Sequence, residues 1–221
     1  MRPPPSAMQF LLLIFILVLA VTIIYLGIFT LALDKLGLST HSAILLLACT
    51  LIGSGINIPL FRISAQASPD EAIRSLPGLV FGRPLSFDGK TIVAINVGGA
   101  LIPISFSIYL ASINPLAPLR ILLAIALVAT VCYFTSRPVR GLGIGMPILV
   151  APITAALTAL LLAPASSAPL AYICGTLGVL LGADLLRLND IRKIGIAVAS
   201  IGGAGTFDGI FLTGIVAVLL A

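Results

Sequence analysis

Two aspartates near the end of the chain are the residues best able to do chemistry. Asp184 closes one long apolar stretch, and Asp208 lies inside the next one, after a Gly-Gly-Ala-Gly run. A carboxylate inside a bilayer costs about 2.5–3.5 kcal/mol on insertion scales, so an aspartate at such a position is a functional-site hypothesis by default. Because the two aspartates fall on neighbouring apolar stretches, they predict one shared site.

The composition indicates the environment in which this site works. Hydrophobic residues make up 60% of the chain, charged residues 9%, and the mean hydropathy is +1.25, which is typical of an integral membrane protein. The net charge of +5 comes from cations between the apolar stretches, so it indicates membrane orientation rather than nucleic-acid binding. We therefore expect the lipid bilayer as partner, no nucleic acid, and a multi-pass protein of the cell (plasma) membrane.

No cofactor or metal is expected. The three cysteines, Cys49, Cys132 and Cys174, are odd in number, lie in apolar stretches and have no metal-binding spacing. His41 is the single histidine and lies alone at a membrane end, so the sequence gives no Ser-His or metal-His catalysis to propose. The cysteines are interpreted as packing residues.

The apolar stretches predict an all-α fold, a bundle of seven transmembrane helices in one membrane domain, residues 1–221. The expected spans are 10–33, 42–61, 91–111, 119–135, 146–163, 169–186 and 194–221, with a cytoplasmic loop over 62–90. Glycine, asparagine and proline interrupt the second and third spans. Within the loop, residues 79–90 form either a small hairpin at the membrane surface or an ordered linker.

The cations test this topology. Ten of the 12 Lys and Arg residues fall on one side of a seven-span chain. Since cations are enriched in cytoplasmic loops, the N-terminus is expected in the cytoplasm and the C-terminus outside. The ten are Arg2, Arg62, Arg74, Arg83, Lys90, Arg137, Arg140, Arg187, Arg192 and Lys193; the other side has Lys35 and Arg120.

Polar residues near the basic ends predict a cavity. Asn57, Asn96 and Asp184 each lie within a few residues of a cytoplasmic cation. Irregular backbone at membrane depth is tolerated only against protein or a water-filled cavity, so we expect a cytoplasm-facing cavity lined by helices two, three, six and seven. On a straight helix Asp208 would lie deeper in the membrane than Asp184. Unwinding of the helix over residues 202–205 would bring the two carboxylates to a similar depth.

Residues around the aspartates complete the predicted site. Asp184 and Asp208 are the catalytic candidates, and the ligand- or substrate-binding candidates are Asn57, Asn96, Gly205, Thr206 and Gly209. The glycine pairs 178/182 and 205/209 have the small-xxx-small spacing that lets helices approach closely. Such an approach would bring the two aspartates together, and simple helix packing explains the pairs equally well.

Two close carboxylates suit peptide hydrolysis, in which one activates water and the other, protonated, polarises the amide. Here the chain resembles the presenilin and signal-peptide-peptidase group, which has one aspartate in its sixth span and a Gly-x-Gly-Asp motif in its seventh. The residues that carry the likeness are Gly203-Ala-Gly205 and Asp208-Gly-Ile-Phe. Thr206 and Phe207 interrupt the motif, Ala183 stands where the group has tyrosine, and its eighth and ninth spans, with their Pro-Ala-Leu element, have no counterpart.

A second resemblance covers more of the chain. The segments Gly-Ala-Asp-Leu-Leu and Gly-Thr-Phe-Asp-Gly-Ile-Phe-Leu-Thr-Gly are similar to the ending of an uncharacterised family of bacterial and archaeal multi-span proteins, a domain of unknown function. This likeness implies that the chain belongs to that family, and it implies no particular activity.

Three functions therefore stay open. The first is a presenilin-like aspartyl intramembrane protease that cleaves a membrane-spanning peptide. The second is an ion-coupled transporter, in which Asn57, Asn96 and the aspartates bind a small cation at broken helices. The third is a non-enzymatic partner subunit, in which Asp184 pairs with Arg187 one turn away. The sequence leaves a homo-oligomer open as well.

Overall fold

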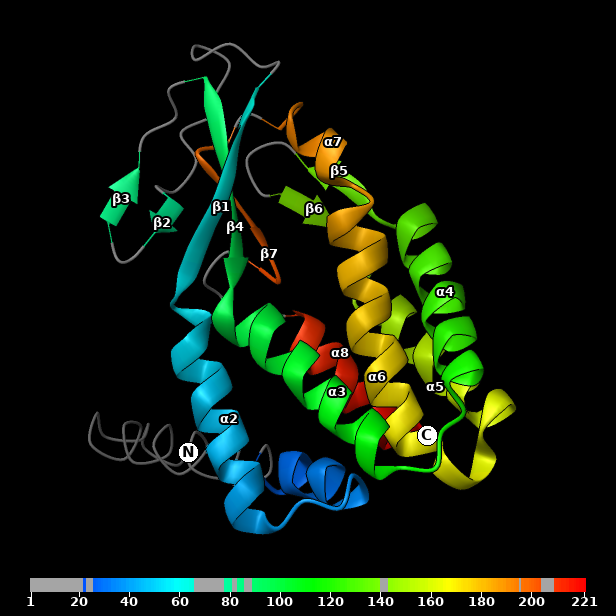
Figure 1. Ribbon diagram of the computed structural model, residues 1–221. Helices are drawn as coiled ribbons and strands as arrows, with labels where there is room; N and C mark the ends of the chain where they lie inside the picture. Colours follow the sequence, from blue (N-terminus) through cyan, green and yellow to red (C-terminus); the bar gives the residue numbers. More distant parts are fainter. Residues whose placement is uncertain are drawn as a thin grey trace, which may run out of the picture.

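The computed structural model describes residues 22, 26–65, 78–80, 83–85, 89–139, 143–194, 196–203 and 209–221, and the elements named below are those of these residues. Helices dominate it, and they pack below a small β-sheet (Figure 1). The α-helices are Leu26–Lys35, α2 (Thr40–Ser54), α3 (Ile102–Ile113), α4 (Pro118–Thr135), α5 (Val150–Leu162), α6 (Ser167–Val179), α7 (Leu188–Ile191) and α8 (Gly209–Leu220).

Two π-helical turns and one 3-10 turn extend these helices. The π-turns are η1 (Val97–Leu101), which leads into α3, and η3 (Leu180–Leu185), which continues α6. The 3-10 turn η2 (Pro164–Ser166) precedes α6. Single π-turns inside helices occur often at functional sites, and η3 contains Asp184.

Three strands form the main sheet in the order β1-β4-β7. β1 (Asn57–Ser64) runs antiparallel to β4 (Lys90–Asn96), with Asn57 opposite Asn96, and β4 runs parallel to β7 (Val198–Ile201). The register of β1 shifts between Pro59 and Phe61, which suits a strand containing a proline that cannot donate to the ladder. Two smaller hairpins pair β2 (Gly78–Val80) with β3 (Arg83–Leu85), and β5 (Arg137–Val139) with β6 (Gly143–Gly145).

The strands correct the all-α prediction. Three of the expected spans, 42–61, 91–111 and 194–221, each combine a strand with a helix: α2 leads into β1, β4 leads into η1 and α3, and β7 precedes α8. The strand segments are rich in isoleucine and valine, which favour strands, and a short apolar run has no period that separates strand from buried helix. The predicted interruptions of the second and third spans are confirmed, because α2 ends at Ser54 and β4 ends at Asn96.

Helix α6 is the centre of the helical part, packed against α3, α4, α5 and α8 (Figure 1). Every α6 residue except Ala168 and Leu177 is buried. A Cβ on Gly182 of η3 would overlap the carbonyl oxygen of Ala129 in α4, and one on Gly178 would lie 2.6 Å from Val128. The 178/182 pair therefore packs against α4, whereas the contact of α6 with α8 uses Gly175 and Gly214.

The outer faces of several helices are apolar and exposed. Ile52 of α2 is 73% exposed, Phe134 of α4 73% and Leu161 of α5 82%. Two helices, Pro118–Thr135 and Pro164–Leu185, are long and apolar enough to cross a membrane. A third crossing results if Leu26–Lys35 and α2, which meet at 113°, count as one broken span. Exposed apolar belts of this kind suit a lipid environment.

The two ends of the molecule differ. The sheet end, defined here as the end that carries β1, β4 and β7, also holds α7 and the β5–β6 hairpin (Figure 1). The C-terminus lies at the opposite end, where Lys35 donates hydrogen bonds of 3.3 Å to the carbonyls of Val218 and Leu219. Phe29 also stacks on Phe211, so the first described helix is held against α8.

Candidate functional site

Asp184 is half-buried in η3, and its carboxylate points toward β7. Its Oδ2 accepts a hydrogen bond of 2.8 Å from the backbone N–H of Gly202. The alternative pairing of Asp184 with Arg187 is not the one observed. Arg187 instead donates to Asp190 at 2.9 Å and to the carbonyl of Tyr133, with its guanidinium 4.3 Å from the centre of the Tyr133 ring. The carboxylate of Asp184 is thus oriented by a backbone amide rather than by this cation.

The backbone N–H of Gly202 can donate to Asp184 because the chain adopts a conformation at this position that favours glycine. Its φ is +86°, a conformation that other residues adopt only with strain. A Cβ at this position would lie 2.7 Å from the Gly99 carbonyl carbon and 2.7 Å from the Ala100 Cβ, so η1 also leaves no room for a side chain. Gly202 therefore fits between η1 on one side and Asp184 on the other.

Asn57 and Asn96 form the hydrogen-bonded junction of strands and helices. Nδ2 of Asn96 donates to Oδ1 of Asn57 at 3.0 Å and to the carbonyl of Ser54 at 2.7 Å. Oδ1 of Asn96 accepts from the N–H of Gly99 at 2.7 Å, which caps η1. The hydroxyl of Ser200 donates to Oδ1 of Asn57 at 2.6 Å, so the same junction also holds β7.

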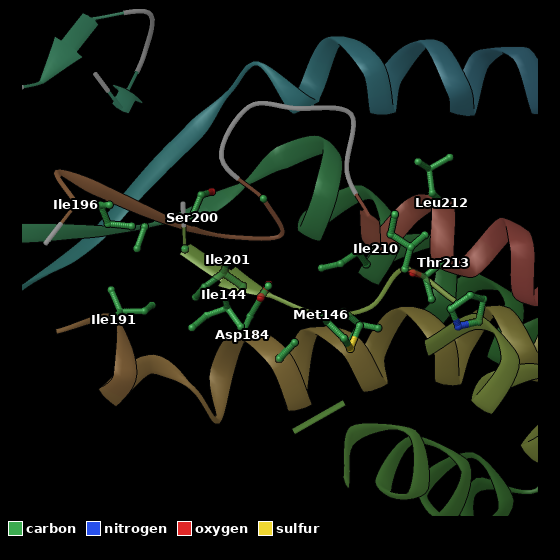
Figure 2. A pocket seen from close by; sticks show the side chains of 18 of the residues that line it. Ile144, Met146, Asp184, Ile191, Ile196, Ser200, Ile201, Ile210, Leu212 and Thr213 are labelled. Carbon is green, nitrogen blue, oxygen red and sulfur yellow. The ribbon is translucent and has the colours of Figure 1, made fainter. Parts of the chain in front are cut away.

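A cavity of about 510 Å³ lies beside Asp184. Figure 2 shows Asp184 and Ser200 toward one part of it, and Leu212 and Thr213 of α8 toward the other. Most of the lining is apolar, with Asp184, Ser200 and Thr213 as its polar side chains. The lining residues come from β6 and the turn after it, α5, α6, η3, α7, β7 and α8.

This cavity differs from the predicted one. Helices two and three were expected to line it, but Asn57 and Asn96 are absent from its lining. Asn57 accepts a hydrogen bond from Ser200, which does line it. The sixth and seventh expected spans do line it, with Asp184 and with β7 and α8. β6, the turn after it and the start of α5 form the other walls, and no signal in the sequence indicated them.

The remaining predicted site residues fall at one short segment. Gly205, Thr206 and Asp208 lie outside the described residues, and Gly209 is the first residue of α8. Gly203, just before this segment, and Ile210, just after it, both line the cavity with Asp184. Described residues on both sides of the segment that contains Asp208 therefore line the cavity.

Sequence reasoning missed Ser200 and Gly202 as site residues. Ser200 links β7 to Asn57, and Gly202 holds the carboxylate of Asp184. The adjacent glycines 202 and 203, directly after the apolar Val-Ala-Ser-Ile run, were an available signal of a tight turn at a strand end. Both have positive φ, +86° and +97°.

At the sheet end, Asp190 of α7 pairs with cations on either side of that helix. Asp190 accepts hydrogen bonds from Arg187 at 2.9 Å and Lys193 at 3.1 Å. These bonds, that from Arg187 above all, lower the pKa of Asp190 below its usual value. Within the described part of the chain, no three His, Cys, Asp or Glu side chains group closely enough to hold a metal ion.

Comparison with known protein families shows the family of this chain. The family described as "Protein of unknown function (DUF1614)" matches residues 51–220, and the chain belongs to it. This confirms the likeness to a family of unknown function, while the likeness to presenilins stays a prediction. No curated protein and no solved structure matched the chain.

Proposed function

We propose that this DUF1614 protein is a membrane-embedded aspartyl protease in which Asp184 and Asp208 form the catalytic pair. The observation that carries the proposal is the lining of the cavity. Asp184 contributes to it together with Gly203 and Ile210, which lie on either side of the segment that contains Asp208. A cavity bordered by both aspartate-bearing segments is what a two-carboxylate site requires.

The chemistry needs two carboxyl groups in different protonation states. The ionised one takes a proton from water, and the water oxygen attacks the peptide carbonyl carbon. The protonated one donates a hydrogen bond to the carbonyl oxygen and then gives a proton to the departing amine as the C–N bond breaks. The N–H of Gly202 holds Oδ2 of Asp184 and so fixes the orientation of one of these groups.

The apolar lining supports a substrate taken from within the bilayer. Ile144, Ile201 and Ile210 surround the Asp184 region, which suits an apolar polypeptide better than a charged one. We propose a plasma-membrane protein with seven passes, three of them completed by strands. The cations Arg62, Lys90, Arg137 and Arg187 belong to elements of the sheet end, which supports a cytoplasmic sheet end and an external C-terminus.

The asparagines favour hydrolysis over ion-coupled transport. A cation would need their amide oxygens as ligands. Oδ1 of Asn57 already accepts from Asn96 and Ser200, and Oδ1 of Asn96 accepts from Gly99. These bonds give both residues a role in joining helices to strands, away from the cavity.

The test is cleavage of a membrane-spanning peptide by the purified protein in liposomes. Asp184→Asn and Asp208→Asn should each lower cleavage by at least about 100-fold, the usual contribution of an acid–base group. Asp34→Asn removes an exposed carboxylate outside the cavity and should leave cleavage unchanged.

Retained cleavage in both cavity variants would disprove the aspartate pair. A wild type that cleaves nothing, but gains thermal stability with one cation through Asp184, would be an ion-coupled carrier. With neither response, the partner-subunit proposal would replace both.

A further inference from the structure

The cavity beside Asp184 has one wall that reaches the lipid-facing surface. Its lining includes Ile148, which is 87% exposed, and Leu149, which is 59% exposed, both just before α5. Across from them Leu212 of α8, 36% exposed, lines the same cavity. We call these three residues, Ile148, Leu149 and Leu212, the mouth.

Exposed apolar stripes continue from the mouth along both helices. On α5 the stripe passes from Leu149 through Ile153 and Leu157 to Leu161, all exposed and four residues apart. On α8 it passes from the exposed Leu212 through the half-buried Val216, which also lines the cavity, to the exposed Leu220. Positions four apart share one face of a helix, so both stripes face outward, and neither contains a polar side chain. The mouth therefore lies between two surfaces suited to lipid.

The other end of the cavity lies along the edge of β7 that faces away from β4. The carbonyl of Ala197 accepts from the N–H of Ile92 in β4. Because successive residues of a strand point their N–H and C=O groups to opposite edges, those of Val198 and Ser200 point away from β4, where the carbonyl of Ser200 accepts a hydrogen bond of 3.2 Å from the N–H of Gly203. Both residues line the cavity, and β7 is the last strand of the sheet among the described residues.

From these observations we propose that the cavity is filled sideways from the bilayer, through the mouth between α5 and α8, by an apolar membrane-spanning polypeptide segment. An acyl chain would also fit the apolar mouth, but it has no donors or acceptors for the outer edge of β7. A polypeptide has both, and leaving such backbone groups without partners inside a bilayer is costly. This inference rests on the proposed function for its substrate and adds the entry route and the residues that form it.

Tryptophan fluorescence tests the route without any cleavage. The protein has no tryptophan, so each introduced one is a single reporter. In vesicles with brominated acyl chains, Leu212→Trp and Ile148→Trp should be quenched about as strongly as Leu157→Trp on the open face of α5. Phe211→Trp is the matched control, since Phe211 adjoins Leu212 on α8 but is 0% exposed, and it should be quenched far less.

The occupant is tested by adding a membrane-spanning Leu-Ala peptide without tryptophan. Each reporter is placed in an Asp184→Asn background, which blocks turnover under the proposed function. The peptide should relieve quenching at Leu212→Trp and Ile148→Trp, and leave Leu157→Trp unchanged. Mouth reporters quenched no more than Phe211→Trp would overturn lateral entry, and quenching that the peptide does not relieve would overturn the polypeptide occupant. Because nothing is cleaved, either failure is separate from failure of the protease proposal.

Discussion

The carboxylate of Asp184 and the backbone amide of Gly202 are joined by a hydrogen bond of 2.8 Å. This bond connects the end of the central helix α6–η3 to the turn after β7. It also sets the direction in which Asp184 faces the cavity. Because Gly202 packs against η1 on its other side, the position of Asp184 depends on both the sheet and the helices.

Gly202→Ala should be strongly destabilising. The new Cβ would combine a positive φ with overlap against Gly99 and Ala100, and each effect costs about 1–3 kcal/mol. Gly37→Ala is the matched control, because Gly37 has φ +78° but open space around its Cβ. Thermal unfolding in detergent should show a clearly larger loss of Tm for Gly202→Ala than for Gly37→Ala. Equal losses would mean that the contact with η1 has no energetic weight.

Asn96→Asp should destabilise the protein at least as much as Asn96→Ala. Aspartate keeps the acceptor for Gly99 N–H, but its second oxygen would face the carbonyl of Ser54 and Oδ1 of Asn57, both acceptors. Unpaired buried polar groups cost about 1–3 kcal/mol, and more when charged. Thermal unfolding of both variants checks this. Asn114→Ala is the control, since Asn114 is half-buried and its side chain donates to the carbonyl of Leu110 four residues before it. An Asn96→Asp protein as stable as wild type would contradict the assigned bonds.

The membrane class and the break positions could be predicted from sequence because they depend on composition and on local residue types. Gly55 and Asn57 mark the change from α2 to β1, and Asn96 with Gly98 marks that from β4 to η1. The strands beside these breaks could not be predicted in the same way. β1, β4 and β7 are stabilised by one another across long sequence separations. Their sequences are also largely apolar, so they lack the alternation of apolar and polar residues by which a half-buried strand is recognised.

The candidate site was predictable in part. Asp184 stood out because a carboxylate is costly in an apolar stretch. The asparagines stood out for the same reason, yet they bind each other and Ser200 rather than line the cavity. Ser200 and the mouth residue Ile148 carry no sequence signal, since their roles come from the packing of β7 and of α5 around the cavity.

Lys35→Met should weaken the end opposite the sheet. Its ammonium donates to the carbonyls of Val218 and Leu219, which are among the last carbonyls of α8 and have no partner within the helix. A cation at a helix C-terminus contributes about 0.3–1 kcal/mol, so a loss of that size is expected. Arg120→Met is the control, because Arg120 is an exposed cation in the first turn of α4, where positive charge is unfavourable. If both variants unfold at the same temperature as wild type, the cap contributes nothing.

Gly182→Ala should separate α6 from α4. Its Cβ would overlap the carbonyl oxygen of Ala129, a backbone atom that cannot rotate away. A shift of η3 would also move Asp184, two residues further on. We therefore expect both a lower Tm and lower cleavage, with overpacking costs of about 1–3 kcal/mol. Gly175→Ala meets Ala155 at 3.2 Å, a milder contact far from Asp184, and should affect stability less and cleavage not at all.

Asp190 should make stability fall in acid. Its pKa is lowered in the folded protein by hydrogen bonds from Arg187 and Lys193, so its ionised form stabilises the fold. This stabilisation is complete above the unfolded pKa of about 3.9 and is lost as the pH falls through the lower folded value. Unfolding measured between neutral and strongly acidic pH should therefore show a smaller acid loss in Asp190→Asn than in wild type. A profile unchanged by Asp190→Asn would show that the ion pairs of Asp190 with Arg187 and Lys193 add no stability.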